Sequence, residues 1–404
     1  MPEMYWLLLL SAGVAGWFLA RIIYKRRSKP KIPGEYLKGL NYLLNEQPDK
    51  ALEVFIELVD VDTETVETHL VLGNMFRRRG EVDRAIRIHQ NLIARPTLAA
   101  LDKSTALLEL AKDYLKAGLL DRAETLLKDV IEIGLQTDEA YPLLLGLYEQ
   151  EKEWNLAIQT TKKLEKVQGK KMNHITAHYY CELSEVALEN NGDVNESQSN
   201  SKQIADKSNG QSMGLSAKQL AKKALSYDKQ CARANVLLGH IAMEEENYKH
   251  AIKFYIAVAK QKPEYLPEVF ANLREAFLRL NDYQGFKQFL LAIKDNNLSG
   301  LTLTNLLVNL SEDDAEKNMV LDWLLEKSEL SLLEVNGFLK SKALEDDSIG
   351  EVGLYKIQES VEQFISDRST HQCNQCGFHG KLLYWQCPSC HSWGTVVPVM
   401  PSLN

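Results

Sequence analysis

A repeat of about 34 residues constrains the fold of this chain more than any other feature of its sequence. Four alanines mark it, at spacings of 34, 38 and 34 residues, and a larger residue follows each alanine four positions later. A small residue or leucine stands twelve positions before each alanine. The alanines are Ala51, Ala85, Ala123 and Ala157, continued at Ala221 and Ala251, and their earlier partners are Gly39, Gly73, Ala111, Leu145 and Gly239. Such self-similarity indicates stacked copies of one structural unit.

This pattern resembles the tetratricopeptide repeat, whose unit is a pair of antiparallel helices. The small residues would let the two helices of a unit approach closely and admit the first helix of the next unit. Gly80 and Gly118 mark turns, and Pro263 ends a unit. We predict an all-α solenoid of about seven units over residues 34–297. In the last unit Phe286 occupies the alanine position.

Two segments interrupt or follow the repeats. Residues 190–214 are rich in Asn, Ser, Gly and Gln and nearly lack apolar residues, so we predict a polar insertion in the turn of the fifth unit. We expect the helix before it to end near Leu188 and the next helix to span Leu215–Ser226. Residues 298–367 lose the period but keep helical runs, and we expect them to continue or cap the solenoid.

The first 24 residues predict a transmembrane helix. Tyr5 to Tyr24 is a run of twenty residues with Arg21 as its single charge, and such a helix is roughly 30 Å long. The basic residues follow the apolar run, in a juxtamembrane linker over residues 25–33, whereas a cleaved signal peptide carries them before it. Because cytoplasmic flanks collect Lys and Arg, we predict one span with Met1 outside and the bulk of the chain in the cytosol. The basic linker would also attract anionic inner-leaflet lipid.

Beyond the linker the chain is acidic, which argues against nucleic-acid binding. Residues 32–404 contain 41 Lys and Arg against 54 Asp and Glu. Phosphate binding depends on neutralising cations, and these are in deficit here. The cysteine-rich end offers no basic face either, because residues 368–404 contain only Arg368 and Lys381 as Lys or Arg. We therefore expect no nucleic-acid partner.

Four of the six cysteines form two pairs near the end of the chain: Cys373, Cys376, Cys387 and Cys390. Two C-x-x-C turns can present four thiolates to one tetrahedral ion, so residues 368–404 predict a small metal-binding ribbon. Iron and zinc both suit four thiolates. Disulfides are the alternative, and a cytosolic location disfavours them. Four protein ligands leave no open position, so the metal would be structural. We expect the aromatic residues Phe378, Tyr384, Trp385 and Trp393 to cover the small core of the ribbon. We also expect docking of this ribbon against the solenoid or a partner protein.

The remaining reactive residues give no catalytic motif. Cys181 and Cys231 lie singly in repeat-type helices, where a small buried side chain is the expected role. His174 and His178 are four residues apart but lack the glutamate of a metalloprotease motif, so we expect a surface or capping role. The sequence contains no glycine-rich phosphate loop and no convincing catalytic triad. We predict that the protein is not an enzyme.

Together, the anchor, the repeats and the terminal ribbon resemble the lipopolysaccharide assembly protein B family of Gram-negative bacteria. Three stretches carry the resemblance: LGNMFRRRGEVDRAIRIHQNLI (Leu72–Ile93), AHYYCEL (Ala177–Leu183) and CNQCGFHGKLLYWQCPSCHSWGT (Cys373–Thr395). The resemblance implies a rubredoxin-like ribbon whose ligands are the four cysteines of the two C-x-x-C turns. The chain departs from the family over the polar insertion, and the resemblance is weaker over residues 300–367.

The resemblance implies an inner-membrane regulator of lipopolysaccharide synthesis with three protein partners. Such a regulator would bring the LpxC deacetylase to the FtsH protease, and a lipopolysaccharide-sensing inner-membrane protein would oppose this action. A second hypothesis is a scaffold that gathers lipopolysaccharide enzymes without directing their turnover. A redox role of the ribbon is a third. The sequence is also compatible with a homodimer and does not decide the oligomeric state.

Overall fold

The fold was analysed in a computed structural model, which describes five stretches of the chain. They are residues 34–45, 66–96, 98–193, 215–294 and 369–399, together with Trp17, Gln47, Lys50, Ala51, Glu53 and Val54. Within these residues no helix combines the length and apolar character needed to span a bilayer. Apart from Trp17, the predicted anchor lies outside the described residues, as do the basic linker and the predicted cap over residues 298–367.

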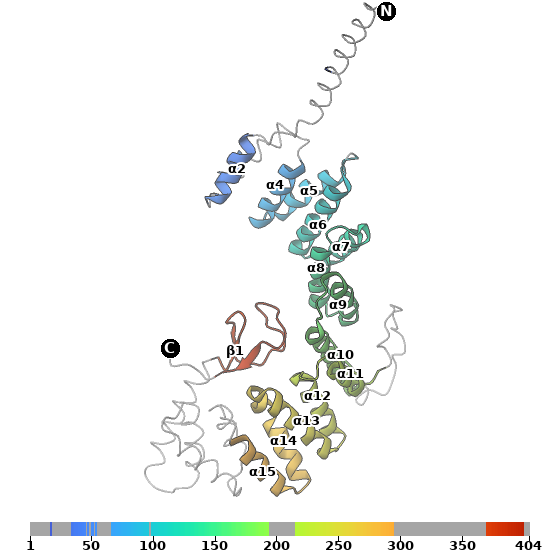
Figure 1. The fold of residues 1–404 in the computed structure, drawn as a ribbon, viewed down its shortest axis with the longest axis vertical. Coiled ribbons are helices and arrows are strands. Elements are labelled where there is room, and N and C mark those ends of the chain that lie inside the picture. The colour runs from blue at the N-terminus through green and yellow to red at the C-terminus, as the bar shows by residue number, and fades with distance from the viewer. Residues whose placement is uncertain are drawn as a thin grey trace, which may run out of the picture. The chain divides into compact units, whose positions relative to one another are not determined.

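The helices form two compact units, and the division falls after Leu147. In unit 1, α4 packs against α5, α5 against α6 and α6 against α7 (Figure 1). Each helix thus packs against the next one along the chain, as in stacked helical hairpins. The helices are α2 (Gly34–Leu44), α4 (Val66–Arg78), α5 (Val82–Ile93), α6 (Ala100–Ala117), α7 (Leu120–Ile133) and α8 (Thr137–Gln150), the last of which crosses the division.

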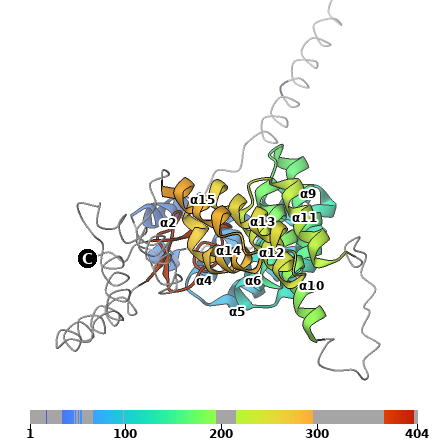
Figure 2. The same cartoon turned by 90° about the horizontal axis from the view of Figure 1, so that it is seen from below.

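Unit 2 continues the same pairing and adds the ribbon. The helix α10 packs against α11, α12 against α13 and α14 against α15, and the first helices also contact one another, α10 with α12 and α12 with α14 (Figure 2). The first helices therefore share one face of this unit. The elements are α9 (Trp154–Gln168), α10 (Asn173–Asp193), α11 (Ala217–Tyr227), α12 (Ala232–Glu244), α13 (Tyr248–Gln261), η1 (Pro263–Tyr265), α14 (Leu266–Arg279) and α15 (Tyr283–Lys294).

The two helices of a pair bury different amounts of surface. The second helix α13 buries only Ala251, Tyr255 and Val258, a narrow stripe at spacings of four and three. By contrast, the first helix α12 buries ten of its 13 residues. A first helix is covered by its own partner and by neighbouring units, whereas a second helix leaves its outer face in water. The predicted alanine positions are confirmed as the core, because all six are fully buried.

The small residues of the first helices allow the close approach that the repeat predicted. A methyl group added at Gly73 would lie 2.4 Å from Nε2 of His89 on α5, and one added at Gly239 would lie 2.2 Å from the Tyr255 ring on α13. Both distances are far below a normal contact between carbon atoms. The larger residue that follows the repeated alanine by four positions therefore fills the space that the glycine leaves. This explains why the two positions occur together in a unit.

The end of α10 differs from our prediction. The helix continues to Asp193, about five residues beyond the expected end near Leu188, and α11 begins at Ala217. Adding residues to an existing helix is easy because only nucleation is costly, so a polar sequence can extend it. On the other side of the insertion, Ser216 caps α11 in a reciprocal capping box with Gln219. Residues 194–214 of the insertion lie outside the described residues.

Unit 1 contains a partly buried ionic cluster that connects α4, α5 and α6. Arg77 on α4 contacts a carboxylate oxygen of Glu109 at 2.6 Å and one of Asp113 at 2.8 Å, both on α6. The other Asp113 oxygen lies 2.5 Å from Nδ1 of His89, and both of these side chains are fully buried. Lys112 extends the cluster to Glu139 at 3.1 Å. Asp113 thus joins α4, α5 and α6 through one carboxylate.

We expect Asp113→Ala to destabilise unit 1 by about 3 kcal/mol, because it leaves a buried imidazole and part of a guanidinium without their partner. Urea unfolding followed by circular dichroism would measure the loss. The exposed Asp129 on α7 provides a matched control, and Asp129→Ala is expected to change the free energy of unfolding by less than about 0.5 kcal/mol. Equal effects of the two substitutions would contradict the assigned role of Asp113.

Candidate metal centre and its seat on the helices

The four predicted cysteines lie on two turns with the same backbone geometry. In the first, the Gly377 amide donates to the Cys373 carbonyl, and in the second the His391 amide donates to the Cys387 carbonyl, each at 2.9 Å. Gly377 and His391 both have positive φ, +75° and +56°. The two turns are therefore equivalent five-residue turns, although only the first has glycine at the position with positive φ, which glycine favours.

A three-stranded antiparallel sheet supports the first turn. The strands are β1 (His371–Cys373), β2 (His379–Gly380) and β3 (Val396–Pro398), in the order β2-β1-β3. Cys373 ends β1, where it pairs with Val396 of β3. The core of the ribbon consists of Cys373, Cys387 and Val396, with Phe378 and Leu383 against it. A core this small cannot stabilise a fold alone, and ribbons of this size depend on a metal.

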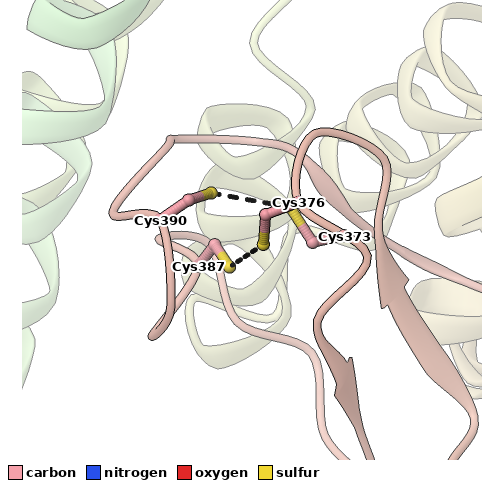
Figure 3. Close-up of side chains that lie close together, drawn as sticks. All are labelled: Cys373, Cys376, Cys387 and Cys390. Atoms are coloured by element: carbon pink, nitrogen blue, oxygen red, sulfur yellow. Dashed lines mark hydrogen bonds between the residues drawn. The ribbon is translucent and has the colours of Figure 1, made fainter. Parts of the chain in front are cut away.

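The four sulfur atoms converge on one point (Figure 3). All lie within 4.8 Å of one another. Sγ of Cys373 is 3.8 Å from Sγ of Cys390, and Sγ of Cys376 is 3.6 Å from Sγ of Cys387. A tetrahedral ion with metal–sulfur bonds of about 2.3 Å places its sulfurs about 3.8 Å apart. The donor set and its spacing therefore fit one tetrahedral metal ion.

Hydrogen bonds favour the thiolate form of two of these cysteines, Cys373 and Cys390, and those of Ser392 lower the pKa of Cys390. Burial alone would raise the pKa of Cys373, but its hydrogen bond with the Thr395 side chain and those from the amides of Cys376 and Gln375 outweigh it and lower the pKa to about 6. For Cys387, burial together with the neighbouring Cys376 and Cys390 raises the pKa to about 11. A cation bound to all four sulfurs would displace the protons that such a cluster still holds.

The ribbon rests on the first helices of unit 2, and Trp393 is the centre of this contact. Its indole Nε1 donates to Glu149 at the end of α8, at 3.0 Å. The same carboxylate accepts hydrogen bonds from the Tyr179 hydroxyl at 2.5 Å and from Gln386 of the ribbon at 3.2 Å. The indole ring stacks on His178 with a centroid distance of 5.2 Å. Trp393 is consequently 6% exposed.

Arg233 of α12 contacts both tryptophans of the ribbon. Its guanidinium lies over the rings of both Trp385 and Trp393, 5.9 Å from each centroid. It also forms ion pairs with Glu182 at 2.8 Å and Glu185 at 2.7 Å. Burial would lower the pKa of Arg233, but these carboxylates reverse the effect and raise it. The guanidinium therefore stays charged, which a cation–π contact requires.

Further contacts fix the ribbon along the same face, which we call the ribbon seat. It comprises the described residues of α8, α9, α10, α12, η1 and α14 that touch the ribbon. The remaining polar contacts are Tyr265 to the Val396 carbonyl at 2.9 Å, His371 to Glu268 at 3.3 Å and His174 to the Trp393 carbonyl at 3.3 Å. Docking of the ribbon against the helices, as predicted, is confirmed for unit 2.

Two predictions about side chains at this contact are wrong. His178 is not a surface residue but is 2% exposed beneath Trp393, because the ribbon covers this part of α10; His174 remains half-exposed. Trp385 and Trp393 were expected to cover the core of the ribbon, but they pack against the helices instead. Phe378 does pack on that core. The indoles thus hold the ribbon to its seat rather than covering the cysteines.

The burial of His178 predicts a pH dependence of docking. Burial, followed by the nearby positive charges of His174 and Arg233, holds the pKa of His178 well below its usual range. The docked state therefore excludes a proton that undocked His178 binds below about pH 6.5. Docking should weaken as pH falls below that value, by up to about 1.4 kcal/mol per pH unit.

Tryptophan fluorescence at constant metal occupancy would follow the docked fraction as the pH is lowered. His178→Phe keeps the aromatic stacking and removes the titrating group, so its docking should be less sensitive to pH over this range. If the substitution leaves the pH profile unchanged, protonation of His178 does not control docking.

Sequence reasoning missed most residues of the seat. Glu149, Tyr179 and Arg233 come from three different helices, and each would be read locally as an ordinary repeat residue. Arg233 carries one detectable signal, since a charged residue in the otherwise apolar run of α12 needs buried partners. The signal shows that partners exist but not which residues they are.

Two family profiles match parts of this chain. The family profile described as the rubredoxin metal binding domain matches residues 371–398, and a tetratricopeptide-repeat profile matches residues 68–102. Among solved structures, the C-terminal part of a tetratricopeptide-repeat protein from Cytophaga hutchinsonii covers 71% of this chain and 99% of its own, at 14% identity and a TM-score of 0.37.

Curated proteins match the chain over nearly its full length. Lipopolysaccharide assembly protein B of Haemophilus influenzae is 31% identical, with 99% of this chain and 98% of that protein covered. The protein of the same name from Escherichia coli K12 is 29% identical with the same coverage. The similarity thus includes the helical units and the ribbon together. This chain belongs to the lipopolysaccharide assembly protein B family.

Proposed function

We propose that this protein is an inner-membrane adaptor that regulates lipopolysaccharide synthesis by promoting degradation of the LpxC deacetylase by the FtsH protease. The observation that carries the proposal is the full-length similarity to proteins named lipopolysaccharide assembly protein B. The name assigns those relatives to lipopolysaccharide assembly, and we extend this role to the present chain. A lipopolysaccharide-sensing inner-membrane protein would relieve the degradation when lipopolysaccharide is scarce.

The architecture suits an adaptor better than an enzyme. Stacked helix pairs present an extended face to protein partners. In the described part of the chain the one cluster with metal-ligand chemistry is the set of four ribbon cysteines, and a tetrahedral site of four thiolates has no position for a substrate. We therefore propose that the protein acts by binding and not by catalysis.

We assign one structural metal ion, iron or zinc, to Cys373, Cys376, Cys387 and Cys390. The convergence of their sulfur atoms supports the assignment. When bound, the ion would supply the cross-link that a core of three buried residues cannot. The two turns and the hydrogen bonds to Cys373 would hold the thiolates in position. Through Trp385 and Trp393, the same turns would keep the ribbon on its seat.

The first helices of unit 1 offer a surface on which a partner could dock. Arg77, Glu109 and Lys112 form a continuous line of ion pairs across α4 and α6. Their side chains are 11–26% exposed, so they are fixed by their partners yet still reach solvent. A surface held rigid before binding loses less entropy when a partner docks. We propose this face of unit 1 as the site for a protein partner.

We propose that residues 1–24 anchor the chain in the inner membrane as a single span, with the N-terminus in the periplasm and the bulk of the chain in the cytoplasm. The apolar run and the basic residues after it support this topology. Anchoring would concentrate the helical units beside a membrane-bound protease and raise the effective concentration of the complex.

The half-life of the deacetylase tests the adaptor hypothesis. Depleting this protein from its host should lengthen that half-life, because the protease would lose the factor that brings it its substrate. An unchanged half-life, combined with stable co-purification of several lipopolysaccharide enzymes, would instead support the alternative of a scaffold without influence on turnover. Depletion with restoration from a plasmid controls for indirect effects.

A further inference from the structure

Two cysteines outside the ribbon are in contact beneath the ribbon seat. Cys181 lies on α10, and Cys231 is the residue immediately before α12. Their Sγ atoms are 4.0 Å apart. Cys181 is fully buried, and Cys231 is 2% exposed. Both are free thiols. The sequence separates them by 50 positions, so nothing local predicts that they meet.

The position of this pair connects it to the ribbon. Cys181 lies one helical turn after His178, which stacks on Trp393. Cys231 lies two residues before Arg233, which covers both indoles of the ribbon. The turn that leads into α12 begins at Asp228, whose carboxylate contacts His174 at 3.0 Å. The two sulfur atoms thus lie between the two helices that hold the ribbon.

The surroundings give the two sulfurs different roles. Hydrogen bonds from Cys181 and from the Ala234 amide at the start of α12 lower the pKa of Cys231, against the opposing effect of its burial. Burial raises the pKa of Cys181 well above its ordinary value. Cys231 is therefore the better nucleophile, because the thiolate is the reactive form, and Cys181 is a protonated thiol within reach of it.

We propose that Cys181 and Cys231 are a redox modification site: a dithiol that peroxide converts into a reversible disulfide linking α10 to α12. The Cys231 thiolate attacks one oxygen of hydrogen peroxide, the O–O bond breaks, and hydroxide leaves with formation of a sulfenic acid. The released hydroxide takes the thiol proton of Cys181 and becomes water; the resulting Cys181 thiolate attacks the Cys231 sulfur, and the S–O bond breaks with release of hydroxide. Two thiols are oxidised and one peroxide is reduced.

The geometry permits this reaction after a small local movement. Bond formation must shorten the sulfur separation from 4.0 Å to about 2.05 Å, which side-chain rotation and a slight shift of the helix ends can provide. Peroxide can enter at the turn between α11 and α12, where Lys229 and Gln230 are exposed. A hydrogen bond of 3.2 Å from the Cys231 amide to the Asp228 carbonyl closes this turn. Opening one such turn is a local event that leaves the core intact.

The disulfide would change the seat on which the ribbon rests. It would draw together the helices that carry His178 and Arg233, and these two side chains contact the same indole. A close-packed contact of this kind transmits small shifts instead of absorbing them. The proposal does not depend on the identity of the protein partners, because it concerns only residues within unit 2.

The test uses the full-length, metal-loaded protein treated with hydrogen peroxide. Free thiols are then blocked by alkylation, and the protein is digested with trypsin without reduction. Cleavage after Lys and Arg places Cys181 in the peptide 172–202 and Cys231 in the tetrapeptide 230–233. Mass spectrometry should show these two peptides joined, with loss of both free thiols, and a reducing agent should separate them again. The bound metal, measured in the same sample, should remain.

Cys231→Ser and Cys181→Ser are the matched controls, and neither should yield the joined peptide. If a serine variant fails to fold, the comparison of peroxide-treated wild type with and without reductant still decides the question, with circular dichroism reporting the fold. The proposal is overturned if the folded wild type gives no joined peptide. It is also overturned if the peptides join only after the helical signal has been lost.

Discussion

Replacing Cys387 with serine is expected to abolish metal binding, unfold the ribbon and release it from the helices. Structural zinc sites of small domains contribute apparent binding free energies of about 10–16 kcal/mol, far more than a core of three buried residues can replace. Cys387 is fully buried, and its sulfur lies 3.6 Å from that of Cys376. A serine hydroxyl is a far weaker ligand than a thiolate for the soft ions that bind four-sulfur sites. Metal analysis should fall from one ion per chain to none.

Two further signals should accompany the loss of metal. Trp393 should move from a buried and Trp385 from a partly buried environment into water, which shifts their fluorescence to longer wavelength. Far-ultraviolet circular dichroism should retain its helical signal, because the helices have cores of their own. Ser389→Ala alters the same turn at an exposed side chain and should retain metal. A metal-free Cys387→Ser protein with its ribbon still docked would refute the structural role of the ion.

Trp393→Ala is expected to undock the ribbon while leaving its metal bound. The indole donates to Glu149, stacks on His178 and lies beneath the guanidinium of Arg233. Truncating a buried tryptophan costs about 3–5 kcal/mol, and here most of that loss falls on the contact between ribbon and helices. The cysteines lie on separate turns, so metal content should stay at one ion per chain.

Hydrogen exchange would localise the effect of this substitution. Amides of α10 and α12 that the ribbon covers should exchange faster in Trp393→Ala than in the wild type. The matched control is Tyr384→Ala, which removes an aromatic side chain of the ribbon that is 38% exposed. It should leave exchange in α10 and α12 unchanged. Loss of metal in Trp393→Ala would show instead that the seat is needed to form the site.

The parts of the fold that depend on local pattern could be predicted from the sequence. The alanines of the second helices are buried because the repeat places them at the contact within each pair, and the sequence shows that spacing directly. The four clustered cysteines were predictable for the same reason, since two short turns encode both ligand pairs. In each case the spacing of residues that are close in sequence is enough to predict the feature.

The ribbon seat could not be predicted, because its residues meet only in the tertiary structure. Glu149 and Trp393 are 244 positions apart, and the chain between them crosses several helix pairs. The wrong prediction for His178 has this cause, since the side chain is buried by Trp393 of the ribbon, more than 200 residues later in the sequence. The pairing of Cys181 with Cys231 was hidden in the same way.

Reconstituted proteolysis tests the central claim most directly. Purified FtsH protease and LpxC deacetylase would be combined in membrane vesicles with or without this protein in its full-length, metal-loaded form, and the decay of the deacetylase would be followed over time. Degradation should be faster when the protein is present, and Cys387→Ser should abolish that acceleration. Equal decay rates with and without the protein would contradict the adaptor function.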